Sequence, residues 1–226
     1  MGAGVGHAGL LTVPASRAYR AVFAVVGGFA LGLQYWLMLT GDTGKGAAEL
    51  TLNFFSYFTI LTNVIVALAL TGPALAPNSR VGRWTSSEGV RAAVAMYIAV
   101  VGLTYHFLLS QVWDPQGWLF VSNGLLHYVM PIAFVLDWLL FTPKGRLRWI
   151  DALKWLAGPT VYVVWTLIHG YASDWWPYWF VNLPALGLSK AAFWFTAMLA
   201  LFLIVGLIIV AIDRTIGRGD RSRGSA

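Results

Sequence analysis

Six long apolar stretches dominate this sequence, and each is about as long as a helix that crosses a membrane. A spanning helix needs roughly 20 mostly apolar residues. The chain is 58% hydrophobic and only 11% charged, whereas a water-soluble domain carries about 25% charged residues. The sequence therefore predicts an all-α polytopic membrane protein, with one six-helix bundle over residues 18–212. The six predicted spans are residues 18–39, 54–71, 90–110, 119–141, 152–169 and 191–212.

The basic residues lie unevenly on the two sides of these predicted spans. Thirteen of the 15 Lys and Arg residues fall on one side, and only Lys45 and Lys190 fall on the other. Because loops rich in Lys and Arg stay in the cytoplasm, we expect both ends of the chain there, as six spans require. The predicted protein crosses a plasma membrane or bacterial inner membrane. We expect a disordered cytoplasmic tail at residues 1–17 and a basic cytoplasmic tail at residues 213–226.

Charge and cysteine content exclude several classes of protein. The net charge of +6 does not indicate a nucleic-acid partner, because the basic residues occupy short loops between apolar stretches. The absence of cysteine excludes disulfides, thiolate metal sites and cysteine nucleophiles. The histidines lack HxxxH spacing, so we predict neither a metal site nor a cofactor. Membrane lipids are the expected partners.

Polar side chains gather where the second predicted span begins. Such groups are costly inside a membrane, so each one requires an explanation. On a single helix, Ser56, Thr59 and Asn63 are three and four residues apart and fall on one stripe. The polar residues of this region are Asn53, Ser56, Thr59, Thr62 and Asn63.

The fourth predicted span carries Asn123 and His127, which are four residues apart and hence on one face. From the predicted direction of the spans, Ser56 and His127 each lie about one to two turns below the outer surface. His106 ends the third span and His169 ends the fifth, both at the same level. These three histidines are therefore expected in the outer half of the membrane.

Two further residues of the fourth span have structural consequences. Pro131 cannot donate a hydrogen bond to the carbonyl of His127, so we expect the helix to widen at that histidine. Asp137 is the only acidic residue inside a predicted span. It lies roughly 15 Å below His127, too far for a direct bond. We expect it to pair with Arg or Lys at the inner boundary, or to face a polar interior.

Together these groups suit nucleophilic attack on an ester. A hydroxyl becomes a nucleophile when a neutral histidine takes its proton, which favours Ser56 as the nucleophile and His127 as the base. Thr59, Asn123 and His106 would orient the base or donate to the developing oxyanion. The same polar residues are also typical of helix packing. A transporter of a small amphipathic solute and a non-catalytic scaffold therefore remain alternative hypotheses.

Three runs of the sequence resemble a known family. They are NFFSYFTILTN at residues 53–63, NGLLHYVMPIAFVLD at 123–137 and WTLIHGYASDWWPYWF at 165–180. Their order and spacing are similar to those of a family of uncharacterised bacterial six-span membrane proteins. That family is distantly similar to the eukaryotic androgen-induced membrane proteins, which hydrolyse fatty-acid esters of hydroxy fatty acids. The resemblance implies a hydrolase whose substrate is a lipid ester.

The resemblance also implies roles for particular residues. In the androgen-induced proteins a threonine early in one helix is the nucleophile, and an intramembrane histidine is its partner. The histidine motif is similar here, with His127 inside residues 123–137. At the nucleophile motif Ser56 stands in place of the threonine, and Thr59 stands in place of an acid. If the alignment is shifted by one turn, Thr59 or Thr62 becomes the nucleophile instead.

The resemblance continues from His169 through Trp175 into the aromatic segment that follows. The whole connection at residues 170–189 is too apolar to lie free in water. We therefore expect it to lie in the membrane interface and to cover part of the site, as a lid would.

Overall fold

The computed structural model describes residues 8–223 of the 226-residue chain. Within this range all regular secondary structure is helical. The predicted all-α class is confirmed, and five helical segments are long and apolar enough to cross a membrane. These segments are Pro14–Thr40, Phe58–Leu75, Glu88–Leu109, Trp118–Phe141 and Leu188–Gly217.

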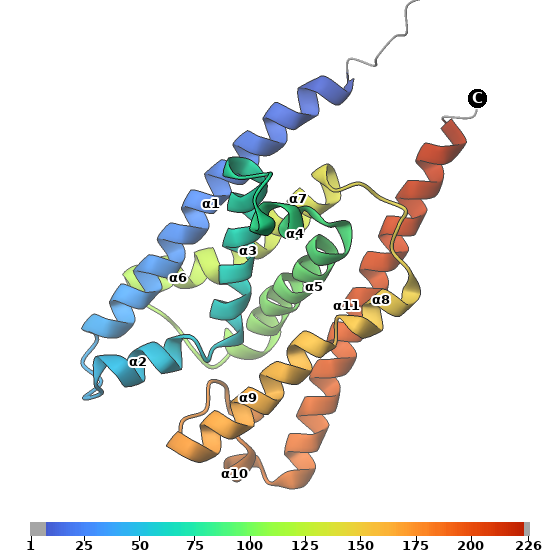
Figure 1. Cartoon of the computed structure of the whole chain (residues 1–226). Helices are drawn as coiled ribbons and strands as arrows, with labels where there is room; N and C mark the ends of the chain where they lie inside the picture. Colours follow the sequence, from blue (N-terminus) through green and yellow to red (C-terminus); the bar gives the residue numbers. More distant parts are fainter. Residues whose placement is uncertain (1–7, 224–226) are drawn as a thin grey trace, which may run out of the picture.

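The described helices form one bundle. In Figure 1, α1 begins and α11 ends at the same end of the molecule, while α2 and α10 lie at the opposite end. Two of the elements, η1 and η2, are π-helical turns, and η3 is a short 3-10 helix. The elements are α1 (Ala8–Thr40), α2 (Ala47–Phe54), α3 (Phe58–Leu75), α4 (Arg80–Ser86), α5 (Glu88–Thr104), η1 (Tyr105–Leu109), α6 (Trp118–Gly124), η2 (Leu125–Val129), α7 (Met130–Phe141), α8 (Trp149–Lys154), α9 (Ala157–Ser173), η3 (Trp179–Val181), α10 (Leu183–Leu186) and α11 (Leu188–Arg223).

The first and last helices are longer than the sequence predicts. Helix α1 begins at Ala8, so the predicted disordered tail is wrong for residues 8–17, while residues 1–7 lie outside the described part of the chain. Helix α11 continues to Arg223, so most of the predicted basic tail is helical. No proline follows α10, and therefore no residue with a fixed, donor-free backbone interrupts α11.

The second predicted span is broken into two helices. Helix α2 ends at Phe54 and α3 begins at Phe58, with a turn between them. Ser56 lies in this turn rather than on the helix that carries Thr59, so the prediction of a single polar stripe is wrong. Helix α2 runs across the end of the bundle, whereas α3 runs along it (Figure 1).

The fifth predicted span corresponds to α8 and α9 together. Helix α9 has 17 residues, slightly fewer than any of the five long apolar segments. It lies beside α11 in Figure 1. Its end is set by Asp174, whose φ of 53° is left-handed and turns the chain away from the helix axis.

Close packing holds the helices around the central α5. The buried core includes side chains of α3, α5, α7 and α11. A Cβ added to Gly102 of α5 would lie 3.2 Å from the carbonyl oxygen of His127 and 3.3 Å from Cβ of Pro131. A side chain at residue 102 would therefore crowd the π-helical turn of His127, and glycine allows the two helices to pack closely. The core side chains include Val66, Met96, Phe134 and Val210.

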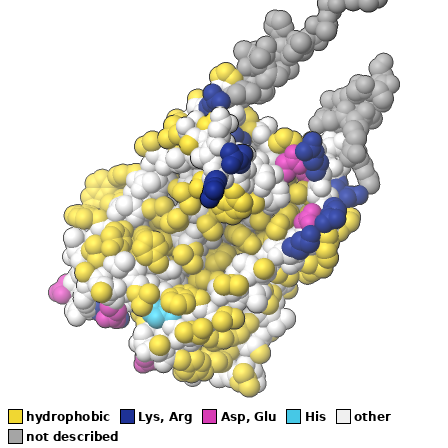
Figure 2. Space-filling model, viewed as in Figure 1, with side chains coloured by type: hydrophobic (Ala, Val, Ile, Leu, Met, Phe, Trp, Pro, Cys, Tyr) yellow, Lys and Arg dark blue, Asp and Glu magenta, His cyan; other side chains and the backbone are white. Residues whose placement is uncertain are grey.

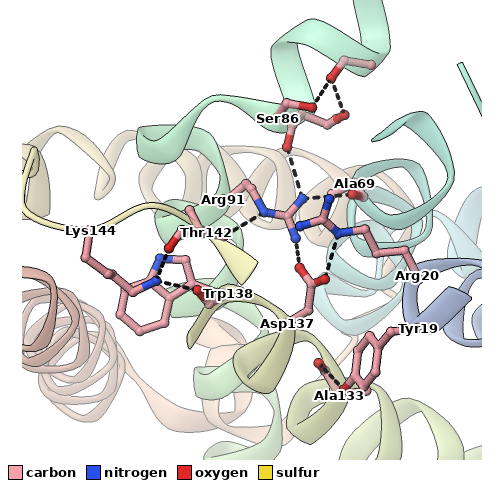
Figure 3. A network of polar contacts seen from close by, with 12 residues as sticks. Tyr19, Arg20, Ala69, Ser86, Arg91, Ala133, Asp137, Trp138, Thr142 and Lys144 are labelled. Atoms are coloured by element: carbon pink, nitrogen blue, oxygen red, sulfur yellow. Dashed lines mark hydrogen bonds and ion pairs between the residues drawn. The ribbon is translucent and has the colours of Figure 1, made fainter. Parts of the chain in front are cut away.

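A cluster of buried charges joins four helices (Figure 3). The fully buried carboxylate of Asp137 pairs with the guanidinium of Arg91 and accepts a hydrogen bond of 2.8 Å from Nε of Arg20. Arg91 also donates to Oγ1 of Thr142 at 2.9 Å and to the carbonyl oxygen of Ala69 at 3.0 Å. The predicted pairing of Asp137 with basic residues is confirmed. The cluster fastens α1, α3, α5 and α7 together.

Much of the described surface of the bundle is apolar. Hydrophobic side chains cover most of the face in Figure 2, and Lys and Arg gather toward the end where α1 begins and α11 ends. Val25, Val161 and Ile204 are each more than half exposed. Contiguous exposed apolar area of this kind is typical of a surface that faces lipid.

Candidate functional site

A cavity of about 390 Å³ lies beside the turn between α2 and α3. Its walls come from α1, α3, α6, the two π-helical turns and the aromatic segment that follows α9. This volume falls within the range of small-molecule sites. The polar side chains on its wall include Gln34, Thr59, Tyr105, Asn123, His127 and Tyr178.

His127 lies on η2, where the helix widens to a π-helical turn at Leu125–Val129. The widening predicted from Pro131 is therefore present, and such turns occur frequently at functional sites. Nδ1 of His127 lies 3.1 Å from the carbonyl oxygen of Asn123. A carbonyl oxygen only accepts, so Nδ1 donates this bond, and a neutral ring then keeps Nε2 as an acceptor.

Thr59 is the hydroxyl that faces this acceptor. Its Oγ1 lies 3.4 Å from Nε2 of His127 and 3.3 Å from the hydroxyl of Tyr178. Its backbone N–H, at the start of α3, donates to the same Tyr178 hydroxyl at 3.3 Å. Hydrogen bonds between catalytic groups are often this long before substrate binds. Thr59, His127 and Tyr178 thus form one connected group on the cavity wall.

Asn123 and Tyr105 fix the orientation of the imidazole ring. The ring of Tyr105 stacks on that of His127, with 4.2 Å between centroids and 26° between planes. The amide nitrogen of Asn123 donates to the hydroxyl of Tyr105. The amide oxygen of Asn123 is buried and has no hydrogen-bond partner among the described residues.

Asn63 ties α3 to the π-helical turn that carries His127. Its amide nitrogen donates to the carbonyl oxygen of Thr59 at 2.9 Å and to that of Leu126 at 3.2 Å. The first bond lies within α3, and the second crosses to η2. Asn63 is fully buried and does not line the cavity described above. Its contacts are those of a residue that positions other groups.

Ser56 lies away from the imidazole. Its hydroxyl donates to the carbonyl oxygen of Leu52 at 2.8 Å and accepts a 3.1 Å bond from the indole N–H of Trp165. Neither Ser56 nor Thr62 is among the described residues that line the cavity, although both are buried. The break between α2 and α3 therefore puts Thr59, not Ser56, beside His127.

Asn53 occupies the last turn of α2 and is buried. Neither atom of its side-chain amide has a hydrogen-bond partner among the described residues. Its carbonyl oxygen accepts the N–H of Ser56 at 3.0 Å and so helps to shape the turn. Asn53 does not line the cavity.

The other two histidines predicted at this level lie apart from His127. His106 is exposed on η1, and its Nδ1 lies 3.2 Å from the hydroxyl of Tyr128. His169 is buried beside two indole rings, with centroid distances of 5.6 Å to Trp165 and 5.3 Å to Trp175. Neither histidine lines the cavity.

Asp137 lies in the buried charge cluster rather than at the cavity. Trp175 packs edge-on against Tyr57, 5.1 Å between centroids, and Tyr57 is itself part of the cavity wall. Across residues 8–223, no group of three His, Cys, Asp or Glu side chains is arranged to hold a metal ion.

Sequence reasoning missed two important members of the site, Tyr178 and Tyr105. Tyr178 belongs to an aromatic segment that the sequence indicates only as interfacial, and it meets Thr59 across 119 residues of chain. Burial raises the pKa of Tyr178, so its hydroxyl keeps its proton and remains a donor. The expected cover over the site is present in part, because Pro177, Tyr178 and Trp179 line the cavity.

The chain was compared with models of protein families, with curated proteins and with solved structures. None of the three comparisons finds a match.

Proposed function

We propose that this protein hydrolyses lipid (fatty-acyl) esters within the membrane, with Thr59 as the nucleophile and His127 as the general base. The observation that carries the proposal is the contact between Oγ1 of Thr59 and the acceptor nitrogen of His127 on the cavity wall. The resemblance to the androgen-induced hydrolases supports it as well. An alignment shifted by one turn from Ser56 brings Thr59 to the nucleophile position.

The reaction begins when Nε2 of His127 takes the proton of Thr59 and the threonine oxygen attacks the carbonyl carbon of the ester. The carbonyl electron pair moves to oxygen, and the hydroxyl of Tyr178 donates to that oxyanion. The bond to the alcohol oxygen then breaks, and this oxygen takes the proton from Nε2. The acyl group remains on Thr59 until water, activated by the same nitrogen, releases the acid.

Asn123 is a positioning residue in this mechanism. Its carbonyl oxygen holds Nδ1–H of His127 and stabilises the imidazolium that forms during attack. The hydroxyl of Tyr178 accepts the N–H of Thr59. Because Oγ1 of Thr59 donates to His127, the proton of Tyr178 points to Oγ1 before the reaction and turns to the oxyanion as that oxygen attacks. The group that activates Thr59 is therefore completed by residues from α3, α6, η2 and the aromatic segment.

We also propose that the chain crosses a plasma or bacterial inner membrane six times, with both ends in the cytoplasm. The 17 residues of α9 extend about 25 Å at 1.5 Å per residue, close to the roughly 30 Å of a hydrocarbon core. The common position of the beginning of α1 and the end of α11 supports an even number of crossings (Figure 1). With this orientation the cavity lies in the outer half of the membrane.

Labelling of single cysteines tests the topology, because the natural chain has no cysteine. In intact cells, a maleimide that cannot cross membranes should label Ser189→Cys. It should label Ser87→Cys only after the cells are lysed. Both positions are exposed. Protection of Ser189→Cys in intact cells, with labelling after lysis, would contradict six crossings.

A fluorophosphonate probe tests the chemistry, because it phosphonylates only activated hydroxyls. Mass spectrometry of the purified protein in nanodiscs should find the adduct on Thr59. The adduct should disappear in His127→Ala and persist in Ser56→Ala. An adduct on Ser56 or Thr62 would replace the proposed nucleophile. No adduct in folded protein would favour a transporter or a scaffold over a hydrolase.

A further inference from the structure

A second cavity, of about 60 Å³, meets the first at Thr59. The two cavities share Thr59, Leu109 and Tyr178 on their walls. The smaller cavity lies between α5, α9 and α11, whereas the larger one lies between α1, α3, α6 and η2. The hydroxyl proposed as the nucleophile therefore stands at the junction of two separate spaces.

The smaller cavity has an apolar wall. Beyond the shared residues, it is formed mainly by aliphatic, aromatic and proline side chains. The hydroxyl of Tyr162 is already used, because it donates to the carbonyl oxygen of Ser56 at 3.0 Å. The apolar side chains on its wall include Val101, Pro159, Val163, Phe195, Met198 and Leu199.

We propose that the smaller cavity is the acyl-binding subsite, and that the larger cavity holds the alcohol part of the ester. This inference rests on the proposed hydrolase function and assigns the two halves of its substrate. In the bound ester the carbonyl carbon lies at Thr59, the acyl chain extends between α5, α9 and α11, and the leaving alcohol points toward His127.

The position of His127 determines which cavity holds the acyl group and which holds the alcohol. The leaving oxygen must accept a proton from Nε2, so it must lie on the side of Thr59 that His127 occupies. His127 and Asn123 line the larger cavity and not the smaller one. The acyl group, which stays attached to Thr59 after the alcohol departs, is left on the opposite side.

The polarity of each space agrees with this assignment. The larger cavity offers the amide of Gln34, the imidazole of His127 and the hydroxyl of Tyr178 to a polar alcohol. The smaller cavity offers a hydrocarbon chain an almost entirely apolar surface. An alkyl group gains free energy from such burial, whereas a polar alcohol would lose hydrogen bonds there.

The volume of the smaller cavity limits the length of the acyl chain that it can hold. A site needs about 10–15 Å³ by this measure for each water-sized group, so the cavity of about 60 Å³ accommodates roughly four to six carbons of an acyl chain. We therefore expect kcat/KM to rise with acyl length up to about six carbons and then to level off, since each buried methylene contributes roughly the same amount.

Thr104 of α5 provides a matched pair of variants. It lines the smaller cavity, and its hydroxyl is buried without a hydrogen-bond partner among the described residues. Thr104→Met fills the cavity, whereas Thr104→Val keeps its size and removes only the hydroxyl. Leu199→Ala enlarges the same cavity from α11.

The first measurement is kcat/KM for p-nitrophenyl acetate, butyrate, hexanoate and decanoate in nanodiscs. Thr104→Met should lower the ratio of the hexanoate value to the acetate value by about tenfold or more. Thr104→Val, which keeps the size of the cavity, should keep that ratio close to the wild-type ratio, and Leu199→Ala should move the plateau to longer chains. A hexanoate-to-acetate ratio that is the same in all four proteins would overturn the subsite.

The second measurement does not depend on turnover. A non-hydrolysable ketone analogue of p-nitrophenyl hexanoate, in which a methylene group replaces the leaving oxygen and the acyl chain ends in a diazirine, is photo-crosslinked to the protein. Adducts should map to Pro159, Val163, Phe195, Met198 or Leu199, persist in Thr104→Val and be lost in Thr104→Met. Adducts confined to lipid-facing side chains such as Phe193 and Ile204, which are exposed, would overturn the subsite.

The two measurements separate failure of the subsite from failure of the function. Ester turnover that involves Thr59, together with crosslinks only on the lipid face, would leave the hydrolase and remove the subsite. Crosslinks inside the cavity that respond to Thr104→Met, without turnover of any ester, would leave an acyl-binding cavity and remove the hydrolase.

Discussion

His127 presents an acceptor nitrogen to Thr59 because its other ring nitrogen is held by the carbonyl oxygen of Asn123 on the preceding turn. Stacking on Tyr105 restricts the rotation of the ring. A hydroxyl of ordinary acidity needs such an oriented base before it attacks a carbonyl. The proposed chemistry therefore depends on the backbone carbonyl one turn before the histidine and on the ring of Tyr105 from a neighbouring helix.

Substitution of Thr59 distinguishes it from the other candidate hydroxyl. Thr59→Ala should lower kcat/KM for ester hydrolysis by about 10³-fold or more, because the attacking oxygen is lost. Thr59→Ser keeps a hydroxyl and should retain measurable turnover. Ser56→Ala is the matched control, since the Ser56 hydroxyl bonds Leu52 and Trp165 away from the cavity. Loss of activity in Ser56→Ala but not in Thr59→Ala would reverse the assignment.

Lys144, in the connection between α7 and α8, should make stability depend on pH. Desolvation lowers its pKa from 10.5 to about 8, and its ammonium group donates to the carbonyl oxygens of Trp138 and Thr142. Between pH 8 and about 10.5 the unfolded chain binds more protons at this group than the folded chain, so stability contributed by this lysine rises with pH.

The measurement is the unfolding midpoint in detergent at pH 8 and pH 10 for the natural protein and for Lys144→Gln. The difference between the two proteins should shift in favour of the natural protein as the pH rises. A difference that stays constant across this range would show that the ammonium group is not desolvated in the folded protein.

Several residues of the site follow from sequence, and others do not. The placement of Asn123 and His127 on one face needs only helical spacing, and the pairing of Asp137 needs only the cost of a buried charge. Tyr178 reaches Thr59 through a tertiary contact between distant segments. Local patterns contain no information on such a contact, so the sequence indicates only an interfacial aromatic residue.

The elements are predicted well where hydropathy alone determines them. The long apolar helices satisfy a length rule that does not depend on packing. The break at Phe55–Tyr57 has neither proline nor glycine to mark it, and a hydropathy window averages over it. The hydroxyl that lies beside His127 could not be chosen from sequence, because this break shifts Ser56 off the helix of Thr59.

Pro131 is expected to keep the π-helical turn in place. Pro131→Ala restores an N–H that can bond the carbonyl of His127, which favours a regular α-helix and rotates the imidazole away from Thr59. Because a displacement of about 1 Å can cost 10²-fold in rate, kcat/KM should fall by roughly 10- to 100-fold while the protein stays folded.

Pro73, inside α3 but outside both cavities, provides the control for this change. Pro73→Ala should leave kcat/KM unchanged. Equal losses in the two variants would indicate a general effect of removing proline. Full activity in Pro131→Ala would mean that the wide turn does not orient the imidazole.

For the molecule as a whole, the charge cluster is the main polar connection between helices far apart in sequence. Asp137 links Arg20 of α1 to Arg91 of α5, and Arg91 reaches the backbone of α3 (Figure 3). Asp137→Asn leaves two largely buried guanidinium groups without a counter-charge. The free energy of unfolding should fall by about 3–5 kcal/mol, as expected when one partner of a buried pair is removed.

Unfolding in mixed micelles of increasing SDS fraction measures this loss. Glu49→Gln is the control, because it removes an exposed pair with Lys45 and should cost less than about 1 kcal/mol. If Asp137→Asn proved as stable as Glu49→Gln, the charges of Arg20 and Arg91 would have to be balanced by groups other than Asp137. The cavity residues lie outside the cluster, so any folded Asp137→Asn protein should still be labelled by the fluorophosphonate probe.

Burial of this cluster should protect its ion pairs from the effect of dissolved salt. Dissolved ions weaken attractions between charges that water surrounds, over about 8 Å at physiological ionic strength. They do not penetrate to a carboxylate whose exposed fraction is zero. Molar sodium chloride should therefore loosen the surface pair of Arg146 and Glu88 while the join between α1, α5 and α7 keeps its strength. The contribution of this buried cluster to the free energy of unfolding should therefore stay the same in fresh and in salty surroundings.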